Sequence, residues 1–167
     1  MSSQAGPKRS KNTTKWSSIT PNLKPTSIPF AMALLLPEEK MDEVVRLCEE
    51  GYPHEVCGLL LGKNRTVMQI FPAKNLNQER SQDRYELDPK DFRRADEEAR
   101  RQGIEIIGFY HSHPDHPAEA SKTDTERAWE GYSYLIVSVL KGKVEKSCCW
   151  RLDKDKMIKE ELEVMHG

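Results

Sequence analysis

An apolar run that ends in two histidines constrains the fold of this chain more than any other feature. The run Ile104–Tyr110 is rich in β-branched and aromatic residues and lies between Gly103 and Pro114, which predicts a buried strand. His111 and His113 follow at its end. Side chains two residues apart in a strand point to the same side, so both imidazoles are expected to face one point.

A carboxylate stands a short distance downstream of the histidines. The segment 114–120 is rich in proline and polar residues, so it is expected to turn the chain back and to bring a helix start beside the strand end. Asp124 then lies in the first turn of that helix. Two histidines and a carboxylate are the ligand types that Zn²⁺ prefers, and catalytic zinc sites leave the fourth position to water. The pattern therefore predicts an open zinc site.

Each part of this pattern also fits a purely structural role. Histidines near a strand end are often surface residues or hydrogen-bonded side chains. Ser121 and Asp124 match a helix capping box, in which the serine caps the helix and the acid bonds back to the backbone. From the residues alone, the metal-ligand and the capping interpretations of Asp124 both stay open.

The complete pattern resembles the signature of a known family, the JAMM (MPN+) zinc metalloproteases. The signature is His-x-His-Pro, then a serine after six residues and an aspartate after two more; this chain fills it with His111, His113, Pro114, Ser121 and Asp124. Members of that family cleave isopeptide or peptide bonds that follow ubiquitin-like modifiers.

The resemblance extends over about residues 34 to 152. Glu55 matches the glutamate that the family carries upstream, close to a strand. The segments Tyr85–Pro89 and Tyr134–Ser138 are similar to the compact prokaryotic branch, which includes the Mec-type peptidases of small sulfur-carrier proteins. The resemblance implies the MPN (JAB) fold, an α/β domain in which helices flank a mixed, curved sheet.

The resemblance also implies a role for each matching residue. His111, His113 and Asp124 would bind Zn²⁺. Glu55 would act as general base and then as general acid, and Ser121 would donate a hydrogen bond to the oxyanion. The implied substrate is a small ubiquitin-like or sulfur-carrier protein with a group attached to its C-terminal Gly-Gly. A deubiquitinase-type isopeptidase that acts on ubiquitin chains and a non-catalytic MPN scaffold module are the alternatives.

Composition sets wider limits. A chain of 167 residues with a net charge of −1 fits one domain and gives no overall attraction to nucleic acid or membrane. The four cysteines lack CxxC spacing and no secretory signal is evident, which favours a reduced cytoplasmic compartment. A zinc deaminase would need Pro-Cys-x-x-Cys, which the sequence lacks. Cys57 is expected to be a small buried hydrophobic residue rather than a redox-sensitive one.

Residues 1–33 contrast with the rest of the chain. They contain basic residues, no acidic residue and many Ser, Thr and Pro, which predicts a disordered basic tail before a single metalloprotease domain over residues 34–167. An organellar transit peptide has a similar composition, but Pro21, Pro25 and Pro29 oppose the amphipathic helix that mitochondrial import needs. Met32 stands just before the folded part, so an overlong start assignment is a further explanation.

The remaining elements follow from periodicity and turn residues. We expect a helix from Pro37 to near Gly51, strands over 56–61 and 66–71 joined by a tight turn, a helix from Asp88, paired strands over 132–140 and 144–152, and a terminal helix over Asp153–Met165. The polar segment 75–84 is expected to be a loop beside the catalytic groove that becomes ordered on the modifier tail.

Overall fold

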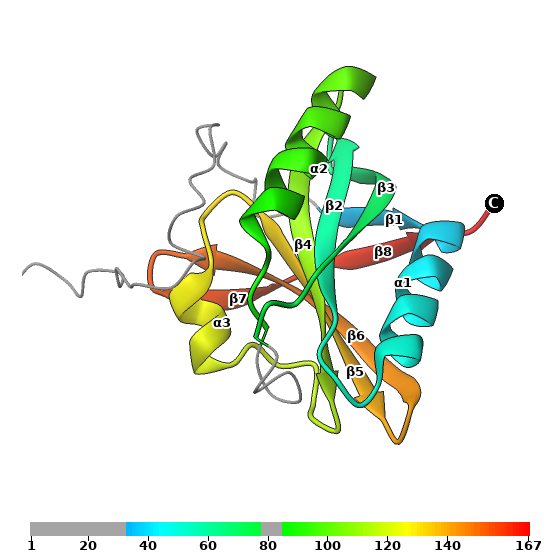
Figure 1. The fold of residues 1–167 in the computed structure, drawn as a ribbon, viewed down its shortest axis with the longest axis vertical. Coiled ribbons are helices and arrows are strands. Elements are labelled where there is room, and N and C mark those ends of the chain that lie inside the picture. Colours follow the sequence, from blue (N-terminus) through cyan, green and yellow to red (C-terminus); the bar gives the residue numbers. More distant parts are fainter. Residues whose placement is uncertain (1–32, 78–84) are drawn as a thin grey trace, which may run out of the picture.

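The computed structural model describes residues 33–77 and 85–167 of the chain (Figure 1). The disordered tail expected over residues 1–33 lies outside the described residues except for its last residue. The same holds for most of the loop expected over residues 75–84. Both expectations stay predictions.

The described residues form three helices and eight strands. In chain order these are β1 Leu34–Pro37, α1 Glu38–Gly51, β2 Cys57–Lys63, β3 Thr66–Ala73, α2 Pro89–Gln102, β4 Glu105–Pro114, α3 Lys122–Arg127, β5 Ser133–Leu140, β6 Lys143–Asp153, β7 Lys156–Glu160 and β8 Leu162–Met165.

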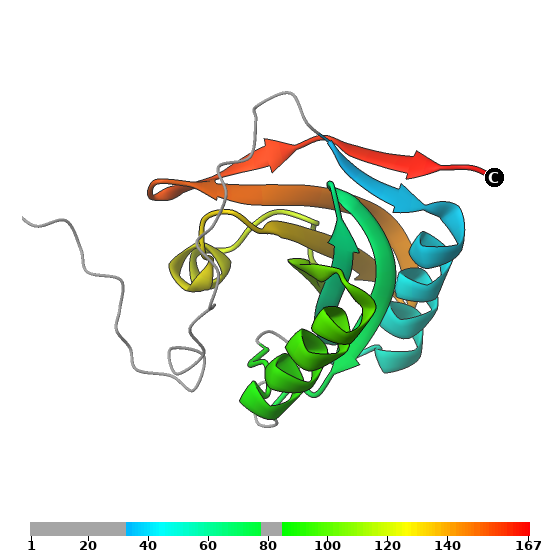
Figure 2. The same cartoon turned by 90° about the horizontal axis from the view of Figure 1, so that it is seen from above.

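All of these strands belong to one mixed sheet in the order β7-β6-β5-β4-β2-β3-β1-β8. The strand pairs expected around two tight turns, β2 with β3 and β5 with β6, are antiparallel, whereas β4 runs parallel to β5. Asn64 and Arg65, between β2 and β3, have φ values of 52° and 65°, as a two-residue hairpin turn requires. The sheet is strongly curved (Figure 2), which confirms the expected mixed, curved architecture.

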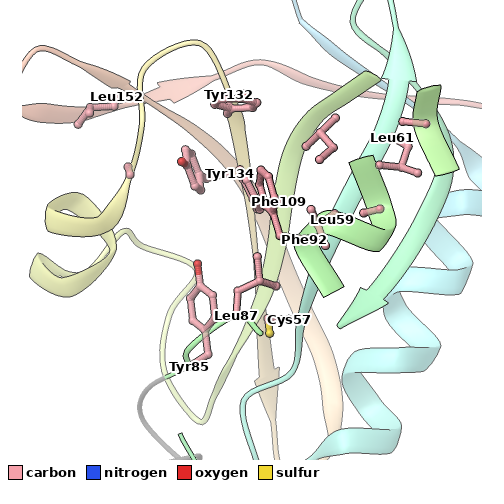
Figure 3. Packing of buried hydrophobic residues seen from close by; sticks show 14 residues of the cluster. Cys57, Leu59, Leu61, Tyr85, Leu87, Phe92, Phe109, Tyr132, Tyr134 and Leu152 are labelled. Atoms are coloured by element: carbon pink, nitrogen blue, oxygen red, sulfur yellow. The ribbon is translucent and has the colours of Figure 1, made fainter. Parts of the chain in front are cut away.

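Helices cover both faces of this sheet, and alternate side chains of β2 pack into the buried clusters on the two faces. Leu60 packs in a buried cluster with Val44 and Cys48 of α1. Leu59 and Leu61 point to the opposite face, into the cluster that holds the apolar side of α2 (Figure 3). A strand that is buried on both faces carries a continuous apolar run rather than an alternating one, which explains the composition of β2.

A register shift in β4 determines which face the histidines occupy. The pairing of β2 with β4 shifts between Leu60 and Leu61, so Ile106 and Phe109 both reach the cluster on the α2 face although they lie three residues apart. From Phe109 onward the strand alternates, and Tyr110 belongs to the α1 face. His111 consequently shares the face of Phe109.

The prediction of a terminal helix over Asp153–Met165 is wrong, because the segment forms β7 and β8. These two strands follow each other directly, yet β7 pairs with β6 and β8 with β1, at opposite ends of the sheet order. Glu160 at their junction is buried and accepts hydrogen bonds from Arg65 and from the Cys149 thiol. These pairings with β6 and β1 outweigh the helix propensity of a Lys- and Glu-rich segment. Strand β1 was likewise not predicted.

All four cysteines are buried free thiols. Cys57, beside the end of β4, is 2% exposed, and burial raises its pKa, with a smaller contribution from the charge of Glu55. A buried thiol with a raised pKa is inert, which confirms the hydrophobic interpretation of Cys57. Within the ranges that the structure describes, no helix has the length and apolarity needed to cross a bilayer.

Deleting residues 156–167 is expected to lower the melting temperature by more than about 10 °C or to abolish cooperative unfolding. The deletion removes the pairing partners of β6 and β1 and leaves Arg65 without Glu160. Thermal unfolding followed by circular dichroism measures this. Deletion of residues 1–31, whose composition is too polar for a core, serves as the control and is expected to leave the transition almost unchanged. A folded, equally stable 156–167 deletion would show that the C-terminal strands do not hold the sheet together.

Candidate metal centre

The side chains of His111, His113 and Asp124 converge on one point. The Nε2 atoms of the two histidines lie 3.2 Å apart. Asp124 Oδ1 lies 3.1 Å from His111 Nε2, and Asp124 Oδ2 lies 3.2 Å from His113 Nε2. The structure thus brings together the residues that the sequence predicts as metal ligands.

The loop between β4 and α3 makes this convergence possible because it is fixed to the neighbouring strands. Ser138 Oγ of β5 donates a hydrogen bond to the His116 carbonyl at 2.6 Å. Trp150 Nε1 of β6 donates to the Ala118 carbonyl at 3.0 Å. The chain therefore turns back along the sheet, as its proline-rich composition predicts, and α3 begins beside the end of β4.

Asp124 also forms the capping box that the sequence left as an alternative. Its backbone N–H donates to Ser121 Oγ at 3.0 Å, and its Oδ2 accepts from the Ser121 N–H at 2.8 Å. The two interpretations of Asp124 are therefore compatible: the cap fixes the carboxylate, and the same carboxylate faces both histidines.

The hydrogen bonds of His113 define what the cluster needs at its centre. His113 Nδ1 lies 2.8 Å from the Pro117 carbonyl oxygen, which can only accept, so Nδ1 carries a proton. A neutral His113 then points the lone pair of Nε2 at the Asp124 carboxylate. Two facing acceptors repel each other unless a cation, either a proton or a metal ion, lies between them. The imidazole nitrogens and the carboxylate of this cluster therefore fit a bound cation.

The pKa shifts of the three side chains agree with a cluster that binds a cation. Burial alone would lower the pKa of His113, but the hydrogen bond and the charge of Asp124 outweigh it and the pKa is raised. Burial lowers the pKa of His111, an effect that Asp124 partly offsets. Burial acts to raise the pKa of Asp124, but the two imidazoles hold it well below its usual range. Asp124 therefore remains a carboxylate near neutral pH.

The spacing of the donor atoms suits zinc. Tetrahedral ligands at about 2.0 to 2.1 Å from Zn²⁺ lie roughly 3.3 Å from one another. The observed separation of the two Nε2 atoms is 3.2 Å. Two imidazole nitrogens and a carboxylate also match the ligand chemistry of catalytic zinc sites, so the residues present fit the ion.

Glu55 lies next to this cluster. It precedes β2, is 4% exposed, and has a carboxylate oxygen within 4.8 Å of ring nitrogens of both histidines. Two bonds between Val56 and Ser112 fix its position: the Ser112 N–H donates to the Val56 carbonyl at 3.0 Å, and the Val56 N–H donates to the Ser112 side-chain Oγ at 3.0 Å. Asp124 contacts both histidines directly, and Glu55 and the two histidines also form a group that could hold a metal ion.

A pocket of about 360 Å³ opens at the cluster. Glu55 and residues of the loop after β4 line it, and the exposed Ser121 stands among the lining residues. His116 also lines the pocket but is exposed, as expected. The remaining lining residues are Tyr85, His113, Pro114, Pro117, Glu119, Ala120, Thr123 and Asp124.

Sequence reasoning missed Asn75 as a residue of this site. Asn75 Nδ2 donates to the Glu55 carbonyl at 3.0 Å, and its Oδ1 accepts from the N–H groups of Asn77 and Glu86, both at 2.9 Å. It therefore ties the chain at Glu55 to both described ends of the 75–86 segment. No motif marks this asparagine, and its bonds to Glu55 and Glu86 join residues that are distant in sequence, so no local pattern could have identified its role in the site.

Residues 37–153 match the family described as prokaryotic homologues of the JAB domain. The chain belongs to this family. It is 40% identical over 112 residues to a desampylase of Haloferax volcanii, covering 63% of this chain and 80% of that protein. It is 32% identical over 94 residues to a desampylase of Pyrococcus furiosus, covering 56% and 64%.

The fold comparison agrees with the family match. A JAB1/MPN domain protein from Archaeoglobus fulgidus superposes with a TM-score of 0.55 at 16% identity, covering 80% of this chain and 98% of that one. The predicted MPN fold and the prokaryotic branch are therefore confirmed, and the matches place the chain among the JAMM-type hydrolases. The Mec-type assignment stays a prediction.

His113→Ala is expected to lose the metal, because it removes a nitrogen donor that faces both other ligands. Metal analysis after purification should give close to one zinc per chain for the wild type and far less for the variant. His116→Ala is the matched control: it removes an exposed histidine of the same pocket and should keep the zinc. Retention of stoichiometric zinc by His113→Ala would contradict the assignment.

Proposed function

We propose that this protein is a zinc-dependent isopeptidase that releases groups attached to the C-terminal Gly-Gly of a small ubiquitin-like or sulfur-carrier protein. The observation that carries the proposal is the convergence of the His111, His113 and Asp124 donor atoms beside Glu55 in one pocket. The two relatives that are named desampylases support a function in removing a ubiquitin-like modifier.

His111 Nε2, His113 Nε2 and the Asp124 carboxylate would hold the zinc. When bound, Zn²⁺ lowers the pKa of a water molecule to about 7 and polarises a carbonyl group. Asp124 suits this role because its depressed pKa keeps it ionised. The hydrogen bond from His113 Nδ1 to the Pro117 carbonyl places the proton on Nδ1. It thereby leaves the lone pair of Nε2 available to bind the metal.

Glu55 would transfer the proton. Its buried carboxylate lies beside the histidines and lines the pocket. It accepts a proton from the attacking water as the new C–O bond forms at the glycine carbonyl. It then gives that proton to the leaving nitrogen as the C–N bond breaks. The products are the free C-terminal carboxylate of the modifier and a free amine.

Ser121 would stabilise the oxyanion. Its Oγ accepts a hydrogen bond from the Asp124 N–H, which uses the oxygen and leaves the hydroxyl proton available to donate. Ser121 lines the pocket with Glu55, so its proton can reach a carbonyl oxygen placed between them. A preorganised donor of this kind contributes about 2.7 to 4 kcal/mol to transition-state stabilisation.

The pocket would admit an extended tail with small residues at the scissile bond. Glu55 and the loop after β4 both line it. The loop is held by the Ser138 and Trp150 side chains, so it resists being displaced by a bulky residue. Extended tails commonly bind by pairing with an exposed strand edge, and two glycines leave room for that close approach.

Glu55→Gln is expected to keep the fold and the zinc but to lower kcat by about 10²- to 10⁴-fold, because an amide cannot take the proton. Glu119→Gln is the control, since Glu119 is an exposed glutamate of the same pocket and should retain near wild-type turnover. Zinc content, melting temperature and kcat are measured for each variant. Cleavage by Glu55→Gln near the wild-type rate would exclude Glu55 as the general base.

Substrate class is tested with a mass-spectrometric panel: a β-grasp carrier extended by Gly-Gly-Cys, the same carrier joined to lysine, linear and Lys63-linked diubiquitin, and casein. We expect the carrier substrates to be cleaved after Gly-Gly, faster than either diubiquitin, and casein to stay intact. Replacing the carrier's Gly-Gly by Ala-Ala should abolish cleavage, because the added methyl groups meet the pocket walls. Casein cleavage at the carrier rate, or an unaffected Ala-Ala substrate, would refute the proposed specificity.

A further inference from the structure

The two histidines of the cluster are supported in different ways. His113 Nδ1 is held by the Pro117 carbonyl at 2.8 Å. His111 Nδ1 is buried and has no hydrogen-bond partner among the residues that the structure describes. A metal-binding histidine usually donates its second N–H to a carbonyl, carboxylate or water, and that bond fixes the orientation of its ring. Among the described residues His111 has no such partner, so a contact that they do make with its ring must orient it.

Tyr85 supplies that contact. Its ring stacks on the His111 imidazole with the centroids 4.4 Å apart and the planes inclined by 27°. The ring of His113 lies on His111 at a steeper angle of 54° with the centroids 5.0 Å apart. Tyr85 is 6% exposed, and burial followed by the charge of Asp124 raises its pKa far above the usual value, so the stacked ring is neutral.

Tyr85 is itself held in place from several sides. Arg127 at the end of α3 donates a hydrogen bond from Nη1 to the Tyr85 carbonyl. The next residue, Glu86, donates its N–H to Asn75 Oδ1 at 2.9 Å. The ring lies at the edge of the buried cluster, near Leu87 and Cys57 (Figure 3). Because α3 also carries Asp124, the stacked ring is fixed relative to another predicted ligand.

We propose that Tyr85 is a positioning residue that orients the His111 imidazole by stacking, in place of the usual hydrogen bond to Nδ1, and that it thereby sets the zinc affinity of the site. This inference rests on the proposed function, because it takes His111 as a zinc ligand. Orientation by stacking requires a flat ring at position 85 and does not require the phenolic hydroxyl. The hydroxyl and the ring can therefore be tested separately.

The test compares Tyr85→Phe, Tyr85→Leu and Tyr85→Met with the wild-type chain. Zinc affinity is measured by chelator competition, and the geometry of the site by the visible spectrum of the Co²⁺-substituted protein. The matched control is Tyr132→Leu, because Tyr132 is a buried tyrosine of the same cluster whose ring contacts are with Phe109 and Trp129. The melting temperature of each zinc-free protein records the general cost of losing a buried ring.

Tyr85→Phe should keep the wild-type affinity and spectrum within about twofold. Tyr85→Leu and Tyr85→Met should weaken zinc binding by roughly 10- to 100-fold, the range that follows from losing the partner that orients a ligand, and should alter the Co²⁺ spectrum. Tyr132→Leu should lower the melting temperature to a similar extent with little change in zinc affinity. Should Tyr85→Leu fail to fold, Tyr85→Met decides the question, because the flexible Met side chain adapts to an irregular gap but offers no flat ring.

The inference alone would be overturned by wild-type zinc affinity in the folded Tyr85→Leu or Tyr85→Met variant, or by an equal loss of affinity in Tyr132→Leu. Loss of zinc affinity in Tyr85→Phe would show that the hydroxyl, and not the ring, supports the site. That result would also contradict the inference. A wild-type chain that binds no zinc would overturn the proposed function as well, so the two failures are distinguishable.

Discussion

The register between β2 and β4 determines where the residues of the candidate site lie. Cys57 pairs with His111 in this register, so Glu55, which precedes β2, stands beside the end of β4. The reciprocal bonds between Val56 and Ser112 extend the pairing past the last ladder residue. A slip of one residue would turn both histidines to the α1 face and away from Glu55. Parallel pairing with β5 then holds the other side of the same strand end, where the loop to α3 is attached.

The convergence of acceptors at this strand end connects the fold to its chemistry. Two imidazole nitrogens and a carboxylate are held within about hydrogen-bond distance of one another by a strand, a loop carbonyl and a helix cap. Without a cation these groups repel, so the native state carries a local electrostatic cost that a bound ion removes. An ion that binds the folded chain and not the unfolded one stabilises the fold by mass action. Metal binding and stability are therefore coupled through the same side chains.

Local patterns in the sequence were sufficient to predict most of the site. The apolar run before His111, the proline-rich loop and the Ser121 cap each act within a few residues, and the structure places the three resulting elements together. Glu55 lies far away in sequence and was identified by the family resemblance. Strands β7 and β8 were predicted as a helix because their pairing with β6 and β1 is not visible in a charged segment. The link from Asn75 to Glu55 and Glu86 and the stacking of Tyr85 on His111 were missed because these partners lie 11 or more residues away.

The central claim is that His111, His113 and Asp124 bind one zinc ion while Glu55 remains outside the ligand set. Glu55 lies close enough to the histidines to compete with Asp124 for that place. A crystal structure of the zinc-loaded chain, with the anomalous signal collected at the zinc edge, tests this most directly. The account predicts one strong peak within about 2.0 to 2.2 Å of His111 Nε2, His113 Nε2 and an Asp124 oxygen, with Glu55 beyond bonding distance. A peak bonded to Glu55 in place of Asp124, or no peak at the two histidines, would contradict it.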